Sequence, residues 1–497
     1  MASPLEYVDA LLAPNAGPSH CGVRAAMSEL RLRPSDTLDI FAFGGSVTLG
    51  SQWQGVQDGN VYPRVLATDL VHRNIVQSVR VHNLAIGATH GAASHALCCE
   101  TLLSPSGLDA TRSIAWQHEG PADARQRPWL VNRTFRGEVR ALPDFGQHAL
   151  ILLEFSNNGV SWLDVLLRRL RERYASAVLI YVDLTSLYAW REGKYPKFVW
   201  NSLWETAPAC TAQLDKWLRS AGADFWSLRG SLLKSNASYY HAADRVFHGD
   251  KLHLKQVGHT LVGRELGGLV AARLRAEEHR AESSGPRRSL PLQARDDASS
   301  SGELCFLWYR SGELDKRLAA SSDGAPIATR HVNRQAQGKS EGWRLLPSAQ
   351  AGSSLHSKEN GKYAFVLESA HNATPLGAAT ATAALEFRFN VTSPRSSLVI
   401  AHMLDGQIYG AAQAELDGAP FGPLLYGSSP NFPYHLLTTQ RLGTVEGVGE
   451  HHLVLRLVRA APTGAQRFRV GGLFVVAENG GGGGYETEYR WTVPHDR

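Results

Sequence analysis

The sequence predicts an α/β three-layer sandwich with a central parallel sheet, followed by a separate all-β domain of the sandwich or jelly-roll type. Three observations support this prediction. Short apolar runs alternate with amphipathic segments from residue 38 to about residue 275, which is the pattern of a parallel sheet covered by helices. The composition changes near residue 280, and helical periodicity disappears beyond it. The chain has 497 residues, which is enough for two or three domains.

Five apolar runs are predicted to form the parallel sheet. Strands covered on both faces should be nearly continuous in apolar residues, and segments such as ILLEF and VLIYV fit that description. The five runs are Leu38–Phe43, Val79–Ile86, His148–Phe155, Ala177–Leu184 and Asp224–Leu228. Apolar residues recur at helical spacing from Trp162 to Tyr174, and a last helix is expected from Gln256 to about Arg280.

The second half of the chain is expected to be β-rich. Gly, Pro, Ser and Asn clusters separate short β-prone segments there, as is typical of antiparallel sandwiches. These segments are Tyr363–Leu367, Ala384–Phe389, Ser397–His402, His452–Val458 and Phe468–Val476. The predicted organisation is an N-terminal extension (1–34), the α/β domain (35–279), a linker rich in Ser, Pro and charge (280–303), the β domain (304–478) and a Gly-rich flexible tail (479–497).

Composition and charge exclude some classes of partner. The chain is 43% hydrophobic and 20% charged, so sizeable cores are available. The net charge of +5 is not gathered into a basic block, so no nucleic-acid partner is expected. No apolar run approaches the ~18 to 20 residues of a membrane span. Residues 1–14 lack the pattern of a secretory signal, whereas four sequons, typical of a glycoprotein, begin at Asn132, Asn236, Asn372 and Asn390. These two observations point in opposite directions, so the sequence does not assign the protein to a cellular compartment.

Five cysteines are present, and no two of them form a CxxC pair. A zinc knuckle or a disulfide framework is therefore not expected. The adjacent Cys98 and Cys99 are interpreted as a buried apolar pair. One or two disulfides stay open for a secreted chain; the other cysteines are Cys21, Cys210 and Cys305.

Candidate catalytic residues, both polar residues and a glycine, follow the predicted strands. Ser46 follows the first strand in FAFGGSVTLG, Gly87 ends the second in HNLAIGATHG, and Asn157 follows the third in ILLEFSNNG. Asp250 and His253 lie near the end of the domain in HGDKLHLKQVG. The carboxyl ends of parallel strands share one edge of a sheet, so these residues are expected to meet there. A serine, an oriented imidazole and several donors are what acyl transfer requires.

Each segment also has a simpler interpretation when taken alone. Gly-Gly-Ser sequences are common in tight turns, and Gly87 alone is an ordinary loop glycine. The asparagines at 157 and 158 would make a good helix N-cap. A metal site with His248, Asp250 and His253 as ligands is a further alternative, although no second group of ligands is obvious.

Taken together and in this order, the four segments resemble the four blocks of the SGNH (GDSL-type) hydrolase family over residues of about 35–275. The resemblance implies an SGNH hydrolase-like, flavodoxin-like fold. By position, Ser46 resembles the nucleophile and one oxyanion donor, and Gly87 and Asn157 resemble the other two donors of the oxyanion hole. Asp250 and His253 resemble the acid and base of a catalytic triad.

The chain departs from the family pattern in two places. The usual Gly-Asp-Ser reads Gly-Gly-Ser at residues 44–46, so the aspartate is missing. The usual Gly-x-Asn-Asp reads Phe-Ser-Asn-Asn at residues 155–158. Neither change removes a group that would handle the proton or the oxyanion, but both leave room for a catalytically silent member.

The resemblance implies a serine esterase, a carboxylic ester hydrolase that needs no metal or organic cofactor. The partner would be an acylated small molecule or glycan, and the oligomeric state stays open. The aromatic-rich segment Trp190–Trp204 and the β domain favour a carbohydrate, which would be deacetylated. Two alternatives stay open: a glycan O-acetyltransferase, and a catalytically silent glycan-binding protein.

Overall fold

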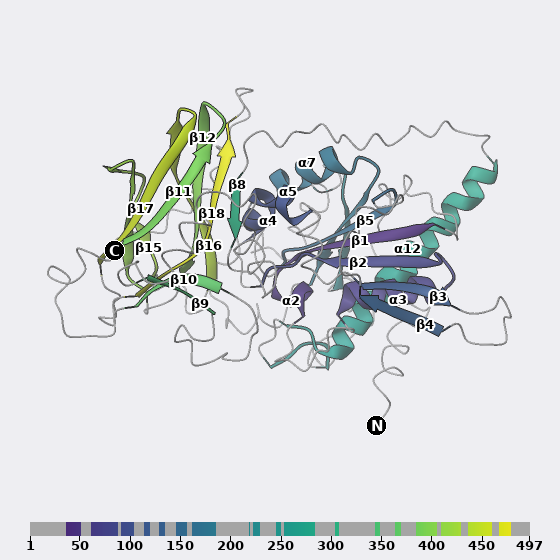
Figure 1. The fold of residues 1–497 in the computed structure, drawn as a ribbon. Coiled ribbons are helices and arrows are strands. Elements are labelled where there is room, and N and C mark those ends of the chain that lie inside the picture. Colours follow the sequence, from purple (N-terminus) through teal and green to yellow (C-terminus); the bar gives the residue numbers. More distant parts are fainter. Residues whose placement is uncertain are drawn as a thin grey trace. The chain divides into compact units, whose positions relative to one another are not determined.

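The computed structural model of the chain consists of two compact units, Met1–Arg295 and Asp296–Arg497 (Figure 1). The described residues of the first unit are 36–50, 61–87, 91–103, 114–119, 129–134, 146–156, 162–184, 218, 222–228, 245–249 and 253–283. Those of the second unit are 304–307, 343–347, 363–368, 384–404, 409–428, 436–459 and 467–478.

The first unit is built on a mixed sheet that has seven strands within the described residues, in the order β4-β3-β2-β1-β5-β6-β7. Its parallel part is β1 (Thr37–Gly44), β2 (Ser78–Asn83), β5 (Ala149–Glu154), β6 (Val178–Asp183) and β7 (Asp224–Ser227). This confirms the predicted parallel sheet, and the order of its strands is that of flavodoxin-like sheets. The sequence did not predict β3 (Ile114–Glu119) and β4 (Trp129–Thr134), which extend the sheet antiparallel beyond β2.

Helices cover both faces of this sheet, so the three-layer prediction is confirmed. Helices α3 (Tyr62–His72) and α12 (Gln256–Ser283) lie on one face, and α4 (Ala93–Leu97), α5 (Cys99–Leu102) and α7 (Leu163–Arg173) lie on the other (Figure 1). On the first face, Leu38 and Ile40 of β1 share one core with Leu66 of α3 and Leu266 of α12. Helix α12 ends at Ser283, inside the segment expected to be linker.

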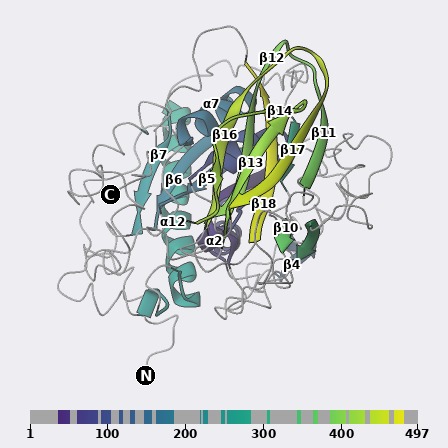
Figure 2. The same ribbon diagram turned by 90° about the vertical axis from the view of Figure 1, so that its left-hand side faces the viewer.

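The second unit contains two antiparallel sheets, as the sequence predicted. One has the order β16-β12-β18-β10-β9, with β8 beside β18, and the other has the order β11-β17-β13-β14, with β15 beside β13. Figure 2 shows the long strands running alongside one another. Phe387 of β11 and Ile400 of β12 belong to one core, so apolar residues of both sheets pack together. The strands are β8 (Leu304–Leu307), β9 (Trp343–Pro347), β10 (Tyr363–Glu368), β11 (Ala384–Val391), β12 (Arg395–Leu404), β13 (Ala411–Leu416), β14 (Ala419–Pro420), β15 (Leu425–Tyr426), β16 (Leu436–Glu446), β17 (Gly449–Arg459) and β18 (Arg467–Ala477).

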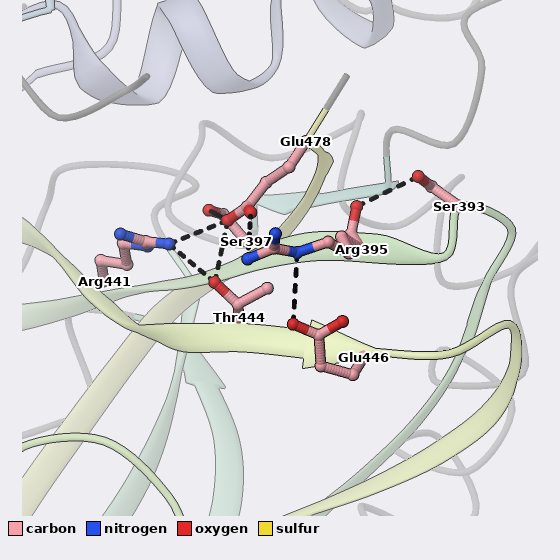
Figure 3. A network of polar contacts seen from close by, with 7 residues as sticks. All are labelled: Ser393, Arg395, Ser397, Arg441, Thr444, Glu446 and Glu478. Atoms are coloured by element: carbon pink, nitrogen blue, oxygen red, sulfur yellow. Dashed lines mark hydrogen bonds and ion pairs between the residues drawn. The ribbon is translucent and has the colours of Figure 1, made fainter. Parts of the chain in front are cut away.

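A polar network joins the ends of three strands of the first of these sheets (Figure 3). Oε1 of Glu478, just beyond β18, accepts hydrogen bonds from Ser397 of β12 at 2.6 Å and from Thr444 and Arg441 of β16 at 2.9 and 2.8 Å. Desolvation raises the pKa of Glu478, but the hydrogen bonds and the neighbouring arginines outweigh it and lower that pKa from 4.5. The carboxylate therefore ties β16, β12 and β18 together.

Two further expectations concern the cysteines and the sequons. Cys98 and Cys99 are both buried, as predicted. The interpretation as an apolar pair is wrong for Cys98, because this residue forms a disulfide. Asn390 is exposed near the end of β11, and Asn132 lies on β4. Asn236 and Asn372 lie outside the described residues.

Candidate active site

Ser46 lies at the carboxyl edge of the parallel sheet, as the sequence predicted. Strand β1 ends at Gly44, and Ser46 begins the single turn α2 (Ser46–Leu49) two residues later. A Cβ atom on Gly44 would lie 2.5 Å from Oγ1 of Thr48 and 2.6 Å from the carbonyl oxygen of Glu154. Only a glycine therefore lets the chain turn so tightly at this point.

His253 meets Ser46 at this edge, although 207 residues separate them in the chain. The Oγ atom of Ser46 lies 2.7 Å from Nε2 of His253, which is hydrogen-bond distance. Both side chains are partly exposed, so a substrate has access to the pair. At this distance the imidazole can accept the hydroxyl proton directly, which is the geometry expected of a nucleophile and its base.

A short backbone pairing positions His253. The N–H of His248 donates to the carbonyl of His253 at 2.8 Å, and the N–H of Lys255 donates to the carbonyl of Val246 at 2.8 Å. Helix α12 begins directly afterwards and packs closely here, because a Cβ atom on Gly258 would lie 2.6 Å from the carbonyl oxygen of Val246. This pairing brings together the two ends of the segment that contains Asp250, which itself lies outside the described residues.

Gly87 lies beside the serine turn. The N–H of Leu84 donates to the carbonyl of Ala42 at 2.8 Å, and that of Ile86 donates to the carbonyl of Gly44 at 2.9 Å. The segment that follows β2 therefore stays paired with β1 as far as Gly44, and the next residue along it is the buried Gly87. Asn157, the third predicted oxyanion donor, lies outside the described residues.

A second histidine behind the site is held neutral. His259 of α12 is buried, and its Nδ1 accepts a hydrogen bond from the N–H of Tyr62 at 3.2 Å. Burial lowers the pKa of His259 to about 3, and the charges of His248 and His253 contribute to this. His259 is therefore neutral at neutral pH and adds no positive charge to the interior next to the candidate site.

Known proteins similar to this chain are found among solved structures. No family model matches the chain, and no curated protein matches it. The chain is similar to a two-domain esterase active on acetylated mannans, co-crystallised with mannopentaose, at 13% identity and a TM-score of 0.44. This similarity covers 90% of this chain and 92% of that one. A Paenibacillus xanthan lyase is similar at 14% identity and a TM-score of 0.21, over 27% of this chain and 12% of the lyase. With TM-scores below 0.5, these similarities do not identify an activity for this chain.

The sequence did not predict a group of buried polar residues that is joined to the turn carrying Ser46. Glu154, Thr48 and Tyr62 are buried and joined by hydrogen bonds. Glu154 alone gave a signal, because a carboxylate at the end of the apolar run ILLEF is costly to bury without a role. Thr48 and Tyr62 are ordinary residues in the sequence and gave none.

Two other properties concern metal binding and membrane spanning. Within the described residues, no group of three or more His, Cys, Asp or Glu side chains is arranged to hold a metal ion. Asp250, a ligand in the metal alternative, is not among those residues. In the described part of the chain, none of the helices combines the length and the apolar character needed to cross a bilayer.

Proposed function

We propose that the chain is a serine esterase of the SGNH type, with Ser46 as nucleophile and His253 as general base. Asp250 would orient the imidazole and stabilise its charged form. The one observation that supports this proposal most strongly is the 2.7 Å distance between Oγ of Ser46 and Nε2 of His253 at the carboxyl edge of a parallel sheet.

The proposed reaction is acyl transfer from an ester to water. As Oγ of Ser46 attacks the ester carbonyl carbon, its proton passes to Nε2 of His253. The imidazolium then protonates the departing alcohol, and an acyl-serine remains. A water molecule, deprotonated by the same imidazole, attacks this acyl group, and the carboxylic acid and free Ser46 result.

Three donors are proposed to hold the negative charge that develops on the carbonyl oxygen. They are the backbone N–H groups of Ser46 and Gly87 and the side-chain amide of Asn157. Each such donor typically lowers the barrier by ~2.7 to 4 kcal/mol, because it is oriented before the charge appears. Backbone pairing up to Ile86, beside Gly44, supports the contribution of Gly87.

The proposed substrate is an acetylated carbohydrate. The aromatic-rich segment Trp190–Trp204, outside the described residues, supports this class because aromatic faces stack well on sugar rings. The described part of the first unit offers a serine and an imidazole to the acyl group. An acetyl ester on a sugar hydroxyl suits this chemistry, since its leaving group is an alcohol that His253 can protonate.

The first experiment is covalent labelling with a fluorophosphonate probe, followed by mass spectrometric mapping of the labelled residue. We expect the label on Ser46 and none on a Ser46→Ala protein. Ser393→Ala removes a serine of the β-rich unit whose Oγ only donates to the backbone of Arg395, so this control should label normally. Equal labelling of wild type and Ser46→Ala would overturn the proposal.

Turnover of p-nitrophenyl acetate and of acetylated polysaccharides separates the roles. His253→Ala should lower kcat more than Asp250→Asn, because the imidazole itself moves the proton. Release of acetate identifies a hydrolase, whereas transfer of acetyl to an added glycan identifies an O-acetyltransferase. Glycan binding without any labelling of Ser46 would identify a silent binding protein and refute the enzyme.

A further inference from the structure

The turn that carries Ser46 is attached to the sheet at several points, and most of them involve Thr48. The carbonyl of Thr48 accepts a hydrogen bond from Nδ2 of Asn83 at 2.9 Å, and its hydroxyl donates to Oε2 of Glu154 at 3.1 Å. The backbone carbonyl of Glu154 also accepts from the N–H of Gly45 at 3.3 Å. One residue of β5 thus holds the serine turn from both sides of Ser46.

The direction of the hydrogen bonds around Glu154 follows from counting protons. The hydroxyl of Thr48 has one proton, which goes to Glu154, so the hydroxyl of Tyr62 must donate to Thr48 at 3.0 Å. On the other side, the N–H of Leu184 donates to Oγ of Ser156 at 2.9 Å, and Ser156 donates to Oε1 of Glu154 at 2.6 Å. Both chains of hydrogen bonds therefore end on the one carboxyl group.

These contacts link the segments that carry the proposed catalytic residues. Ser46 and Thr48 share the turn α2, Ser156 immediately precedes Asn157, and Tyr62 reaches helix α12 through its backbone N–H to His259. A buried polar network in which every member is satisfied holds its residues in one arrangement, because any other leaves polar groups unpaired. Glu154 is the residue at which the two chains of this network meet.

Burial of this carboxyl group has an energetic cost that packing does not explain. Glu154 has no exposed surface. Burial raises the pKa of Glu154 above 4.5, hydrogen bonds from Ser156 and Thr48 oppose the rise, and the nearby Asp183 adds to it. An apolar residue would fill the same position without that penalty, so packing alone does not account for a carboxyl group here.

From these contacts we infer that Glu154 is a positioning residue for the proposed serine nucleophile, acting through the hydroxyl of Thr48 on the turn that carries Ser46. This inference rests on the proposed function. Glu154 does not touch the substrate in this scheme. It holds Oγ of Ser46 where the imidazole and the ester can both reach it, and a displacement of about 1 Å at such a site can cost on the order of 100-fold in rate.

The test compares substitutions at both ends of the Glu154–Thr48 hydrogen bond. Glu154→Gln keeps the shape of the side chain but cannot accept from both hydroxyls, and Thr48→Val keeps the shape but has no hydroxyl. We expect each to lower kcat for p-nitrophenyl acetate by roughly 10- to 100-fold with little change in KM. Thr68→Val is the matched control, because its hydroxyl donates only to the carbonyl of Arg64 within α3, at 3.0 Å.

Two further measurements distinguish positioning from general loosening. The double variant Glu154→Gln, Thr48→Val should be hardly slower than Thr48→Val alone, since Glu154 is inferred to act through the hydroxyl that Thr48→Val has already removed. Thr48→Ser keeps the hydroxyl and should recover most of the rate. Active sites are counted by total fluorophosphonate incorporation, so that each rate is expressed per folded, reactive protein. If the Glu154→Gln protein does not fold, the comparison of Thr48→Val with Thr68→Val decides the question.

The outcomes are distinct. A wild-type protein that neither reacts with the probe nor hydrolyses the ester refutes the proposed function itself. A reactive wild type with Thr48→Val as fast per active site as Thr68→Val refutes only the role of Glu154. That role is also refuted if the rate losses of the single variants multiply in the double variant.

Discussion

His259 provides a quantitative test of the interior next to the candidate site. Its ring is buried and stacks on Tyr62, with the ring centres 6.2 Å apart, and its Nδ1 accepts the N–H of Tyr62. Burial lowers the pKa of His259 to about 3 from an ordinary value of 6.5. Protons therefore bind the unfolded chain before they bind the folded one, so the stability from neutral His259 is present above pH 6.5 and is lost as the pH falls toward 3.

The size of this loss follows from the two pKa values. Between pH 7 and pH 5 the unfolded histidine becomes almost fully protonated while the folded one stays neutral, which costs the folded state about 2 kcal/mol. Any folded pKa below about 4 gives nearly the same loss at pH 5, because the folded histidine is then neutral at that pH. In the variant His259→Gln, which does not titrate, this loss of stability should be absent. The amide oxygen of the glutamine can still accept a hydrogen bond from the N–H of Tyr62, so the two proteins remain comparable.

Hydrogen exchange of α3 (Tyr62–His72), measured in wild type and His259→Gln at both pH values, gives the comparison directly. The peptide is the same in both proteins, so its intrinsic exchange rates cancel in the ratio of variant to wild-type rates. The effects of all other titrating groups cancel in the same ratio. The ratio of variant to wild-type rates for the slowest amides should fall roughly 30-fold from pH 7 to pH 5. An unchanged ratio would refute the neutral, buried state of His259.

Two other substitutions test the tight turn and the network of the second unit. In Gly44→Ala, the new Cβ would lie 2.6 Å from a backbone oxygen that cannot easily move, so we expect a loss of about 1–3 kcal/mol in urea denaturation together with lost esterase activity. Glu478→Gln should destabilise the second unit by about 1.5–3 kcal/mol at pH 7, because it removes charged hydrogen bonds to Thr444 and its neighbours. Since the pKa of Glu478 is lowered in the folded state, this difference should shrink as the pH falls below about 4.5.

Matched controls exist for both substitutions. Gly268→Ala adds a Cβ on α12 with nothing within 4 Å, so it should be neutral or stabilising by up to about 1 kcal/mol. Glu446→Gln alters a carboxylate that is 66% exposed and pairs with Arg395, and it should cost less than about 1 kcal/mol. Equal effects of a substitution and its control would contradict the corresponding prediction.

The sequence predicted those elements whose signal is local. A parallel strand with both faces covered must be apolar along its whole length, and β5 and β6 appear in the sequence as ILLE and VLIYVD. The helical spacing of apolar residues in α7 and the change of composition near residue 280 are local features of the same kind. Strands β3 and β4 have no such continuous run, since WQHE and NRT interrupt them, and they were missed.

The candidate site likewise combines residues that local sequence patterns predict with a geometry that only the fold determines. Ser46 and His253 stood out because a serine after Gly-Gly and a histidine three residues after an aspartate are short-range patterns at predicted strand or helix ends. The 2.7 Å contact between them depends on the strand order, which brings the ends of β1 and α12 together, and no local pattern encodes that distance.

The sequence alone therefore determined which residues are the catalytic candidates. Only the tertiary structure decided which buried residues hold the segments that carry them. Glu154, Thr48 and Tyr62 are joined by hydrogen bonds between residues 14 and 106 positions apart, and Asp39 is paired with Arg80 across neighbouring strands. Buried polar groups must find partners wherever the fold supplies them, and those partners are neighbours in space. Their roles become visible only when the strands have been placed side by side.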